Sequence, residues 1–180
     1  NSQVLDRALI KTHTAIGPWC KVAGEVGGTI FQGYANKAHD GHLGDSFVGE
    51  WSNLGAGTTN SNLLNTYAQL TSRAEPDGRT EHTGQQFLGA MIGDHCKFAI
   101  SSRLMTGCVL HTGVMWAATA PVIGCVPRFA WSTDAGLRSF RQDKFIDIAK
   151  AVMARRKLTP SAAYLARLAA LFALTPTAHS

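Results

Sequence analysis

The sequence predicts a left-handed parallel β-helix built from hexapeptide repeats, followed by C-terminal α-helices. The first observation is that aliphatic residues followed by glycine recur five and then six residues apart, at Leu43-Gly44, Val48-Gly49 and Leu54-Gly55. This period fits neither an α-helix nor an alternating strand. It is typical of a hexapeptide β-helix, in which each short strand turns one aliphatic side chain into a narrow core. The second observation is that the apolar residues after Leu137 recur at helical spacing instead.

The hexapeptide period extends on both sides of this stretch. It is found again at Ile16 and Val22, and later at Ile92, Phe98 and Leu104. The first ten residues contain several apolar side chains and are compatible with either a short helix or an earlier coil of the solenoid. We therefore expect the β-helix to occupy residues 1–136.

The period is lost between Asn60 and Thr83. This segment contains Pro76-Asp77-Gly78, a combination that favours a turn because proline fixes one backbone angle and glycine allows a positive φ. Insertions in β-helices project as loops from one face. The sequence therefore predicts a loop excursion at about residues 63–82 that bends around Asp77-Gly78.

Residues 137–180 are expected to form a helical extension. The apolar stripe of a first helix lies at i, i+3, i+4 and i+7, namely Phe145, Ile148, Ala149 and Val152. Near its end at Lys157-Leu158, Arg155 and Arg156 suit the negative end of the helix dipole. We prefer this interpretation of the two arginines to a ligand site.

A second helix is predicted after Thr159-Pro160, which reads as an N-cap followed by a first-turn proline. Its apolar stripe consists of Leu165, Leu168 and Phe172. An uncapped solenoid end would expose strand edges. We therefore expect the helical pair to cap the open end of the solenoid or to pack on a neighbouring subunit.

The composition is that of a globular chain of 180 residues, with 45% hydrophobic and only 16% charged residues. A surface with so few charged residues suits a solenoid whose sides are covered by partners. The net charge of +5 is compatible with a mildly basic surface, or with attraction of phosphate-bearing substrates such as coenzyme A or a sugar phosphate. The basic residues are scattered rather than clustered with aromatics, so we expect no nucleic-acid partner.

Neither a membrane partner nor a redox centre is expected. No run approaches the ~18 apolar residues needed to span a bilayer. None of the four cysteines forms a C-x-x-C pair, which favours reduced thiols in a cytoplasmic protein over a redox or zinc motif. The chain opens on Asn1 without a secretory signal pattern, so we expect it to begin inside a longer protein.

A family resemblance is carried by residues 33–46 and 53–62, which read G-Y-A-N-K-A-H-D-G-H-L-G-D-S and N-L-G-A-G-T-T-N-S-N. These runs resemble the C-terminal β-helix of sugar-phosphate nucleotidyltransferases. That family is related to the acyltransferase half of the bifunctional N-acetylglucosamine-1-phosphate uridyltransferase and glucosamine-1-phosphate acetyltransferase. The resemblance extends over about residues 16–131. It implies a homotrimer that transfers an acetyl group from acetyl-CoA, or another acyl group from acyl-CoA, to an amino sugar or a sugar phosphate.

The same resemblance implies roles for individual residues. The general base of the acyltransferase corresponds to His39, four residues before Leu43, and Asp40 or Asp45 could orient its ring. A histidine with an ordinary pKa can accept a proton at neutral pH. The two asparagines that position the sugar and its amine correspond to Asn53 and Asn62.

Two further candidates are His42 and Lys37. His42 stands where the family has a tyrosine, so we include it as a substrate-binding residue and as the next candidate for the base. Lys37 is a candidate ligand for a substrate phosphate, with a solvated lysine as the alternative. A basic residue that the family carries after the second asparagine has no clear match beyond Asn62.

Two other functions remain open at the level of sequence. The nucleotidyltransferase chemistry of the resembled proteins belongs to an N-terminal domain whose Gly-rich nucleotide loop is absent here, so the chain could be a non-catalytic trimerisation domain that supports such a partner. A second class of β-helix, the γ-type carbonic anhydrases, holds zinc with three histidines. None of the seven histidines shows that ligand spacing, so we expect no metal.

Overall fold

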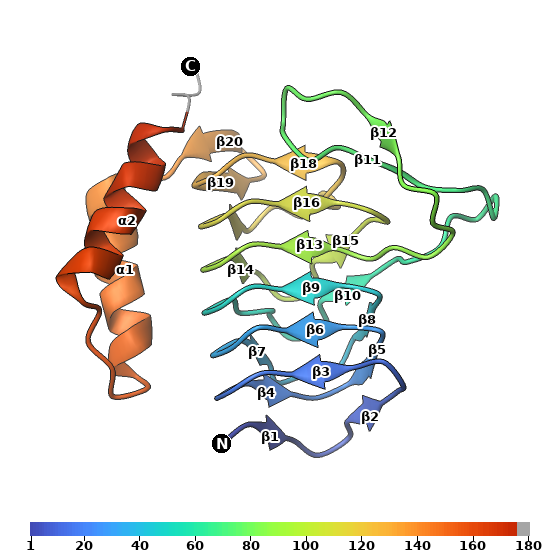
Figure 1. Ribbon diagram of the computed structural model, residues 1–180, viewed down its shortest axis with the longest axis horizontal. Helices are drawn as coiled ribbons and strands as arrows, with labels where there is room; N and C mark the ends of the chain where they lie inside the picture. Colours follow the sequence, from blue (N-terminus) through green and yellow to red (C-terminus); the bar gives the residue numbers. More distant parts are fainter. Residues whose placement is uncertain (176–180) are drawn as a thin grey trace.

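The protein is a left-handed parallel β-helix with two α-helices beside it, as the sequence predicts (Figure 1). This architecture comes from a computed structural model, which describes residues 1–175. Residues 176–180, the end of the expected C-terminal extension, lie outside the described residues.

The strands stack along three faces of a prism. Face A consists of β1 (Gln3–Val4), β4 (Lys21–Val22), β7 (Asn36–Lys37), β14 (Lys97–Phe98), β17 (Met115–Trp116) and β19 (Ala130–Thr133), with the antiparallel strand β20 (Gly136–Ser139) at its end. Face B consists of β2 (Leu9–Ile10), β5 (Glu25–Gly27), β8 (His42–Gly44), β10 (Thr59–Asn60) and β15 (Arg103–Leu104). Face C consists of β3 (Ala15–Ile16), β6 (Ile30–Phe31), β9 (Phe47–Val48), β13 (Met91–Ile92), β16 (Val109–Leu110) and β18 (Cys125–Val126).

Each short strand turns one side chain inward and its neighbour outward, because successive Cβ atoms of a strand point to opposite faces. In β9, for example, Val48 is buried while Phe47 is exposed. The hexapeptide positions Leu43, Val48 and Leu54 all lie in the core. The period seen in the sequence is therefore the period of inward-facing residues.

The three corners of the prism are named after the faces they join. Corner AB contains residues 38–41, corner BC contains residues 45–46, and corner CA contains residues 49–52. At many of the turns one residue adopts a positive φ. At corner CA the residues with a left-handed backbone are Trp19, Tyr34, Trp51, His95, Gly113 and Phe129. For the non-glycine residues this backbone is strained, and it persists because the neighbouring coils fix each turn.

The first ten residues form a coil and not a helix. β1 pairs with β4, β2 with β5, and β3 (Ala15–Ile16) with β6. The three pairings continue the prism to the N-terminus and decide between the two alternatives that the sequence left open.

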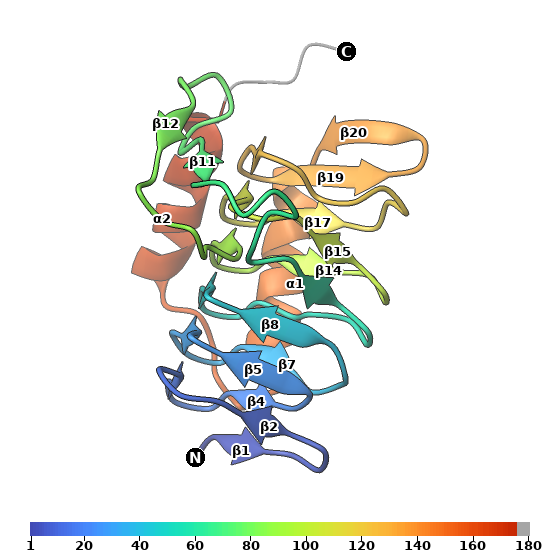
Figure 2. The same cartoon turned by 90° about the vertical axis from the view of Figure 1, so that its right-hand side faces the viewer.

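The excursion leaves the prism at corner BC, between β10 and β13. It contains β11 (Thr71–Ser72) and β12 (Glu81–His82), which pair in antiparallel fashion and project from the stack (Figures 1 and 2). The Ser72 hydroxyl donates to the Gly107 carbonyl oxygen at 2.9 Å. This contact holds the hairpin against corner BC of the coil that contains β15 and β16.

The helices α1 (Gln142–Ala154) and α2 (Ala162–Ala173) run alongside the stack and do not close its end (Figures 1 and 2). The expectation of an end cap is therefore wrong. The physical reason is that aromatic side chains line corner CA, and the helices bury their own aromatic rings against them. Phe172 stacks on Phe129 with ring centroids 3.5 Å apart, and Phe145 meets Phe129 edge-on at 4.9 Å.

The helix ends differ slightly from the predicted ones. The cap of α2 is Ser161 and not Thr159, because the Ser161 hydroxyl accepts the Tyr164 backbone N–H at 3.1 Å. α1 ends at Ala154, so Arg155 is its C-cap and Arg156 lies beyond it. The expected division into residues 1–136 and 137–180 stays a prediction, and β20 extends across it.

Neither α1 nor α2 is long and apolar enough to cross a bilayer. The four cysteines are free thiols, and Cys20, Cys96 and Cys108 are buried.

Candidate functional site

The motif run from Asn36 to Asn62 spreads its polar side chains over three places on the prism. His42 and Asn62 meet on face B, His39 lies at corner AB, and Asn53 lies on face A beside α1. The structure therefore brings two of the expected site residues together and separates the other two from them.

His42 is held by a carboxylate from the coil below. β5 and β8 pair in parallel register, so Glu25 lies directly beneath His42. The His42 Nδ1 atom lies 3.3 Å from Glu25 Oε1, and the Lys11 ammonium contacts the same oxygen. The Lys11 hydrogen bond is the main reason why the pKa of Glu25 is lowered, with His42 contributing further. Glu25 is therefore an anion at neutral pH that can orient the imidazole and stabilise its protonated form.

The second ring nitrogen of His42 lies close over the backbone of Gly44. A Cβ atom at Gly44 would lie 2.7 Å from His42 Nε2 and 2.8 Å from Asn62 Nδ2. Asn62 in turn donates to Asp45 Oδ2 at 2.6 Å, which fixes the amide. Because residue 44 has no side chain, a histidine nitrogen and an asparagine amide lie close together over its backbone on face B.

Asn60 builds the floor of this site. The strands β8 and β10 lie side by side, and the Asn60 side chain links them. Its Oδ1 accepts the Gly44 N–H at 2.8 Å, and its Nδ2 donates to the Gly44 carbonyl oxygen at 2.8 Å. The buried amide thus replaces two backbone hydrogen bonds and fixes the backbone of residue 44, as buried polar groups require partners.

His39 lies on a different surface, at corner AB. It borders an open cavity of about 520 Å³ together with Arg7, Asp40 and Ser101. In residues 1–175 we find no hydrogen bond from the His39 ring to a carboxylate. Its geometry is therefore less defined than that of His42.

Lys37 points into the core. Only 1% of the residue is exposed, and its ammonium donates to the carbonyl oxygens of His39 at 2.8 Å and Ala23 at 3.2 Å. Burial lowers the pKa of Lys37 to about 8, and nearby Asp40 opposes this shift. The Lys37 side chain therefore links the backbones of two coils at corner AB from inside the prism. Its role as a phosphate ligand remains a prediction.

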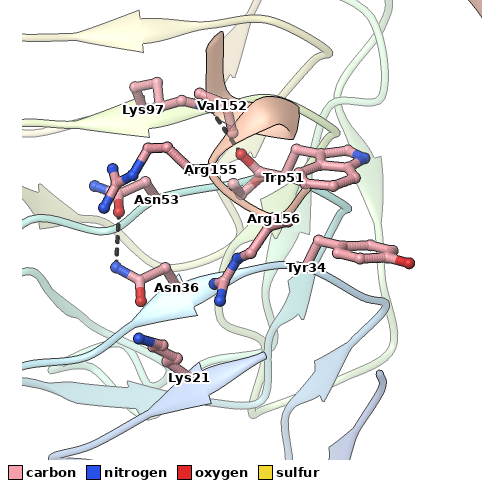
Figure 3. A pocket seen from close by; sticks show the side chains of 10 residues that line it. Lys21, Tyr34, Asn36, Trp51, Asn53, Lys97, Val152, Arg155 and Arg156 are labelled. Atoms are coloured by element: carbon pink, nitrogen blue, oxygen red, sulfur yellow. Dashed lines mark hydrogen bonds between the residues drawn. The ribbon is translucent and has the colours of Figure 1, made fainter. Parts of the chain in front are cut away.

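Asn53 lies in a groove between face A and the end of α1 (Figure 3). Its Oδ1 accepts Asn36 Nδ2 at 2.8 Å. The groove has a volume of about 330 Å³. The resemblance placed Asn53 and Asn62 at one sugar site, whereas here they lie on different faces of the prism.

No three side chains of His, Cys, Asp or Glu gather into a metal-binding group among the described residues. His39, His42 and His95 occupy corner AB, face B and corner CA. His95 is buried under α2, where its Nε2 lies 2.6 Å from the Tyr164 hydroxyl, and burial lowers its pKa to about 3. The histidines of these coils are thus dispersed over three separate parts of the prism.

Sequence reasoning missed Glu25 and Lys11. The signal that could have found Glu25 is the coil length, because Glu25 precedes its stacking partner His42 by one turn of the prism. The irregular stretch from Gly24 to Gly33 hid this register in the sequence.

No family model and no curated protein matches the chain. Among solved structures it is similar to AntD, an N-acyltransferase from Bacillus cereus, in complex with dTDP-4-amino-4,6-dideoxyglucose and coenzyme A. The identity is 14%, the match covers 86% of this chain and 91% of AntD, and the TM-score is 0.49. It is also similar to LpxA from Acinetobacter baumannii at 11% identity and a TM-score of 0.30, over 82% of this chain and 75% of LpxA. Similarity at this level does not decide the function.

Proposed function

We propose that the chain is an acyl-CoA-dependent acyltransferase domain that acts on the amine of an amino sugar or amino-sugar phosphate. The observation that carries this proposal is the His42–Glu25 pair beside Asn62 on face B. Acyl transfer to an amine needs a base for the amine proton, and a histidine oriented by a carboxylate is suited to that role. The motif run that resembles hexapeptide-repeat acyltransferases supplies two of these three residues.

In the proposed reaction the amine nitrogen attacks the thioester carbonyl carbon, and His42 Nε2 takes the amine proton. The C–N bond forms, the C–S bond breaks, and the thiolate leaves with the proton returned by the imidazolium. Glu25 stabilises the charged ring while it holds the proton. The Asn62 carboxamide oxygen can accept a hydrogen bond from the amine or from a sugar hydroxyl.

His39 is the second candidate for the base, as the resemblance implies. Its support is the open cavity at corner AB, which is large enough for part of a substrate. His42 has the stronger support, because it alone of the two is paired with a carboxylate.

We also propose that the chain forms a homotrimer through face C. The outward residues of the strands on this face form an apolar row, consisting of Ala15, Ile30, Phe47, Met91, Val109 and Cys125. Beside the last coils of the row lies Glu75 of the excursion, which contacts His111 and Arg128. Faces A and B carry lysine, glutamate, histidine and arginine at the equivalent positions. A neighbouring copy on face C would stand beside corner BC and would add a wall to the His42 site.

The alternative function is a non-catalytic trimerisation domain of a sugar-phosphate nucleotidyltransferase. It is favoured by the inward direction of Lys37 and by the separation of Asn53 from Asn62, since both weaken a direct transfer of the resembled active site. Under this alternative the partner is a nucleotidyltransferase domain. We also propose that the protein is cytoplasmic.

The test is thiol release from acetyl-CoA in the presence of glucosamine-1-phosphate and a panel of other amino sugars. We expect His42→Ala to lower kcat/KM by about 10²–10⁴-fold, the usual contribution of a general base. Glu25→Gln should lower it less and change its pH profile. His39→Ala should leave the rate unchanged.

Two outcomes would overturn parts of this proposal. If His39→Ala loses activity and His42→Ala does not, the base lies at corner AB. If the wild-type protein releases no thiol with any acceptor and binds no coenzyme A by calorimetry, the trimerisation-domain function stands instead.

A further inference from the structure

A concave basic surface lies where face A meets the end of α1 (Figure 3). We call it the α1 groove. Four cationic side chains line it, from three elements that are distant in the sequence. They are Lys21 of β4, Lys97 of β14, and Arg155 and Arg156 at the end of α1.

The charge of the α1 groove is not balanced by acidic residues. Its other lining residues are neutral, and none of its four cations forms an ion pair with a carboxylate in the described chain. The whole sequence carries a net charge of only +5, so four uncompensated cations in one groove are a strong local concentration. A concave site with one sign of charge attracts ions of the opposite sign.

The side chains are also suited to an anion by their chemistry. Arginine guanidinium groups bind phosphate oxygens in a bidentate manner, and lysine adds a point charge. The Lys97 ammonium donates to the carbonyl oxygens of Trp51 at 2.7 Å and His95 at 3.2 Å, so it is held in place with one N–H remaining. Asn53 uses its oxygen for Asn36 and keeps its own N–H groups for a ligand.

The dimensions favour a small ligand over a polymer. The volume of about 330 Å³ lies at the lower end of the range for ligand pockets. Trp51 and Tyr34, stacked at 4.1 Å, form an aromatic wall at one side. Four cations from three elements are enough to contact both phosphates of a diphosphate ester, which carries one negative charge on each phosphate.

We propose that the α1 groove binds a diphosphate ester, the group shared by coenzyme A and by nucleoside-diphosphate sugars. Binding of this group is supported by the four cations that line the groove and by its volume. The role of the groove as a substrate subsite rests on the proposed acyltransferase function. The groove is built within one chain, and the end of α1 closes it over face A.

Calorimetry with inorganic pyrophosphate, UDP and coenzyme A tests this site without requiring turnover. We expect wild-type protein to bind at least one of the three, and the double variant Arg155→Ala/Arg156→Ala to bind it about 10–100-fold more weakly. Lys21→Gln, a change on a different element, should weaken it as well. Lys150→Ala removes one positive charge, as Lys21→Gln does, from an exposed position of α1 outside the groove and should leave the affinity unchanged.

The pattern of losses identifies the source of the diphosphate. If the arginine variant loses coenzyme A and not UDP, the groove holds the acyl donor, and the reverse pattern assigns it to the acceptor nucleotide. The proposal is overturned if the wild-type protein binds none of the probes at millimolar concentration. It is equally overturned if the arginine variant binds like wild type, or if Lys150→Ala weakens binding as much. Binding without thiol release would contradict the acyltransferase function alone.

Discussion

At the residue scale, Gly44 lies beside His42 and not beside His39, so a substitution at Gly44 tests which of the two histidines is the base. Because Gly44 lacks a Cβ atom, His42 Nε2 and Asn62 Nδ2 can lie close over its backbone. The atoms in the way are the ends of flexible side chains, so an added methyl group displaces them without breaking the coil.

Gly44→Ala should therefore leave the fold intact and lower kcat/KM for acyl transfer by about 10²-fold, the effect of a small displacement of reacting groups. The matched control is Gly33→Ala, where the nearest atoms lie at ordinary contact distances of 3.4 and 3.5 Å. Steady-state kinetics and thermal melting of both variants check this. Wild-type kinetics for Gly44→Ala would place the base away from face B.

Lys37 makes stability depend on pH. Its pKa is about 8 in the folded protein and 10.5 in its ordinary state. Between these values the folded protein releases the proton while the unfolded chain keeps it, so the free energy of unfolding contributed by Lys37 rises with pH. Below about pH 8 the buried ammonium is charged in both states, and this contribution reaches its minimum.

Lys37→Met removes the titrating group and keeps a similar length. The stability of wild type relative to this variant should increase from pH 8 to pH 10.5, as measured by urea unfolding at a series of pH values. Comparing the two proteins removes the parallel contribution of Lys97, whose pKa burial also lowers to about 8. A constant difference over this range would contradict the prediction.

At the element scale, the attachment of α2 depends on one polar contact within an aromatic interface. The Tyr164 hydroxyl lies 2.6 Å from the buried His95 Nε2. Tyr164→Phe leaves this ring nitrogen without that partner, which costs about 1–3 kcal/mol.

Amide hydrogen exchange measures the loss of local stability separately in α2 and in the coils. In Tyr164→Phe the amides of α2 should exchange faster, while those of β5 and β8 keep their protection, because local opening follows local stability. Tyr67→Phe, at an exposed position of the excursion, is the control. Equal acceleration in all coils would mean that α2 and the prism unfold as one unit.

At the scale of the whole molecule, the three faces differ in what they present to solvent. Face C has an apolar outward row, in which Ile30 is 49% exposed and Phe47 is 36% exposed. Burying such a row contributes roughly 25 cal/mol per Å² of apolar surface. A trimer formed through face C would recover this free energy.

Phe47→Glu introduces a charge into the middle of the row and should convert the proposed trimer to monomers at micromolar concentration, as measured by light scattering. Phe87→Glu makes the same change at an exposed site in the excursion and should leave the mass unchanged. A trimer that survives Phe47→Glu would rule out face C as the interface.

The sequence by itself determined the fold class of this protein. In a β-helix each coil repeats the same local geometry, so the hexapeptide period at Leu43, Val48 and Leu54 reports the core directly. The helical spacing after Phe145 likewise predicted two helices, because it depends only on neighbouring turns. The run at residues 36–62 also marked the coils that carry the candidate site.

The tertiary structure alone decided which of these residues meet. Glu25 reaches His42, and Asn53 lies away from Asn62, because the number of residues at each corner varies from coil to coil and sets the stacking register. The α1 groove likewise required the docking of α1 on corner CA, which depends on aromatic contacts between residues far apart in the chain. Contacts of this kind leave no period in the sequence, since their spacing is fixed by irregular turns and not by a repeat.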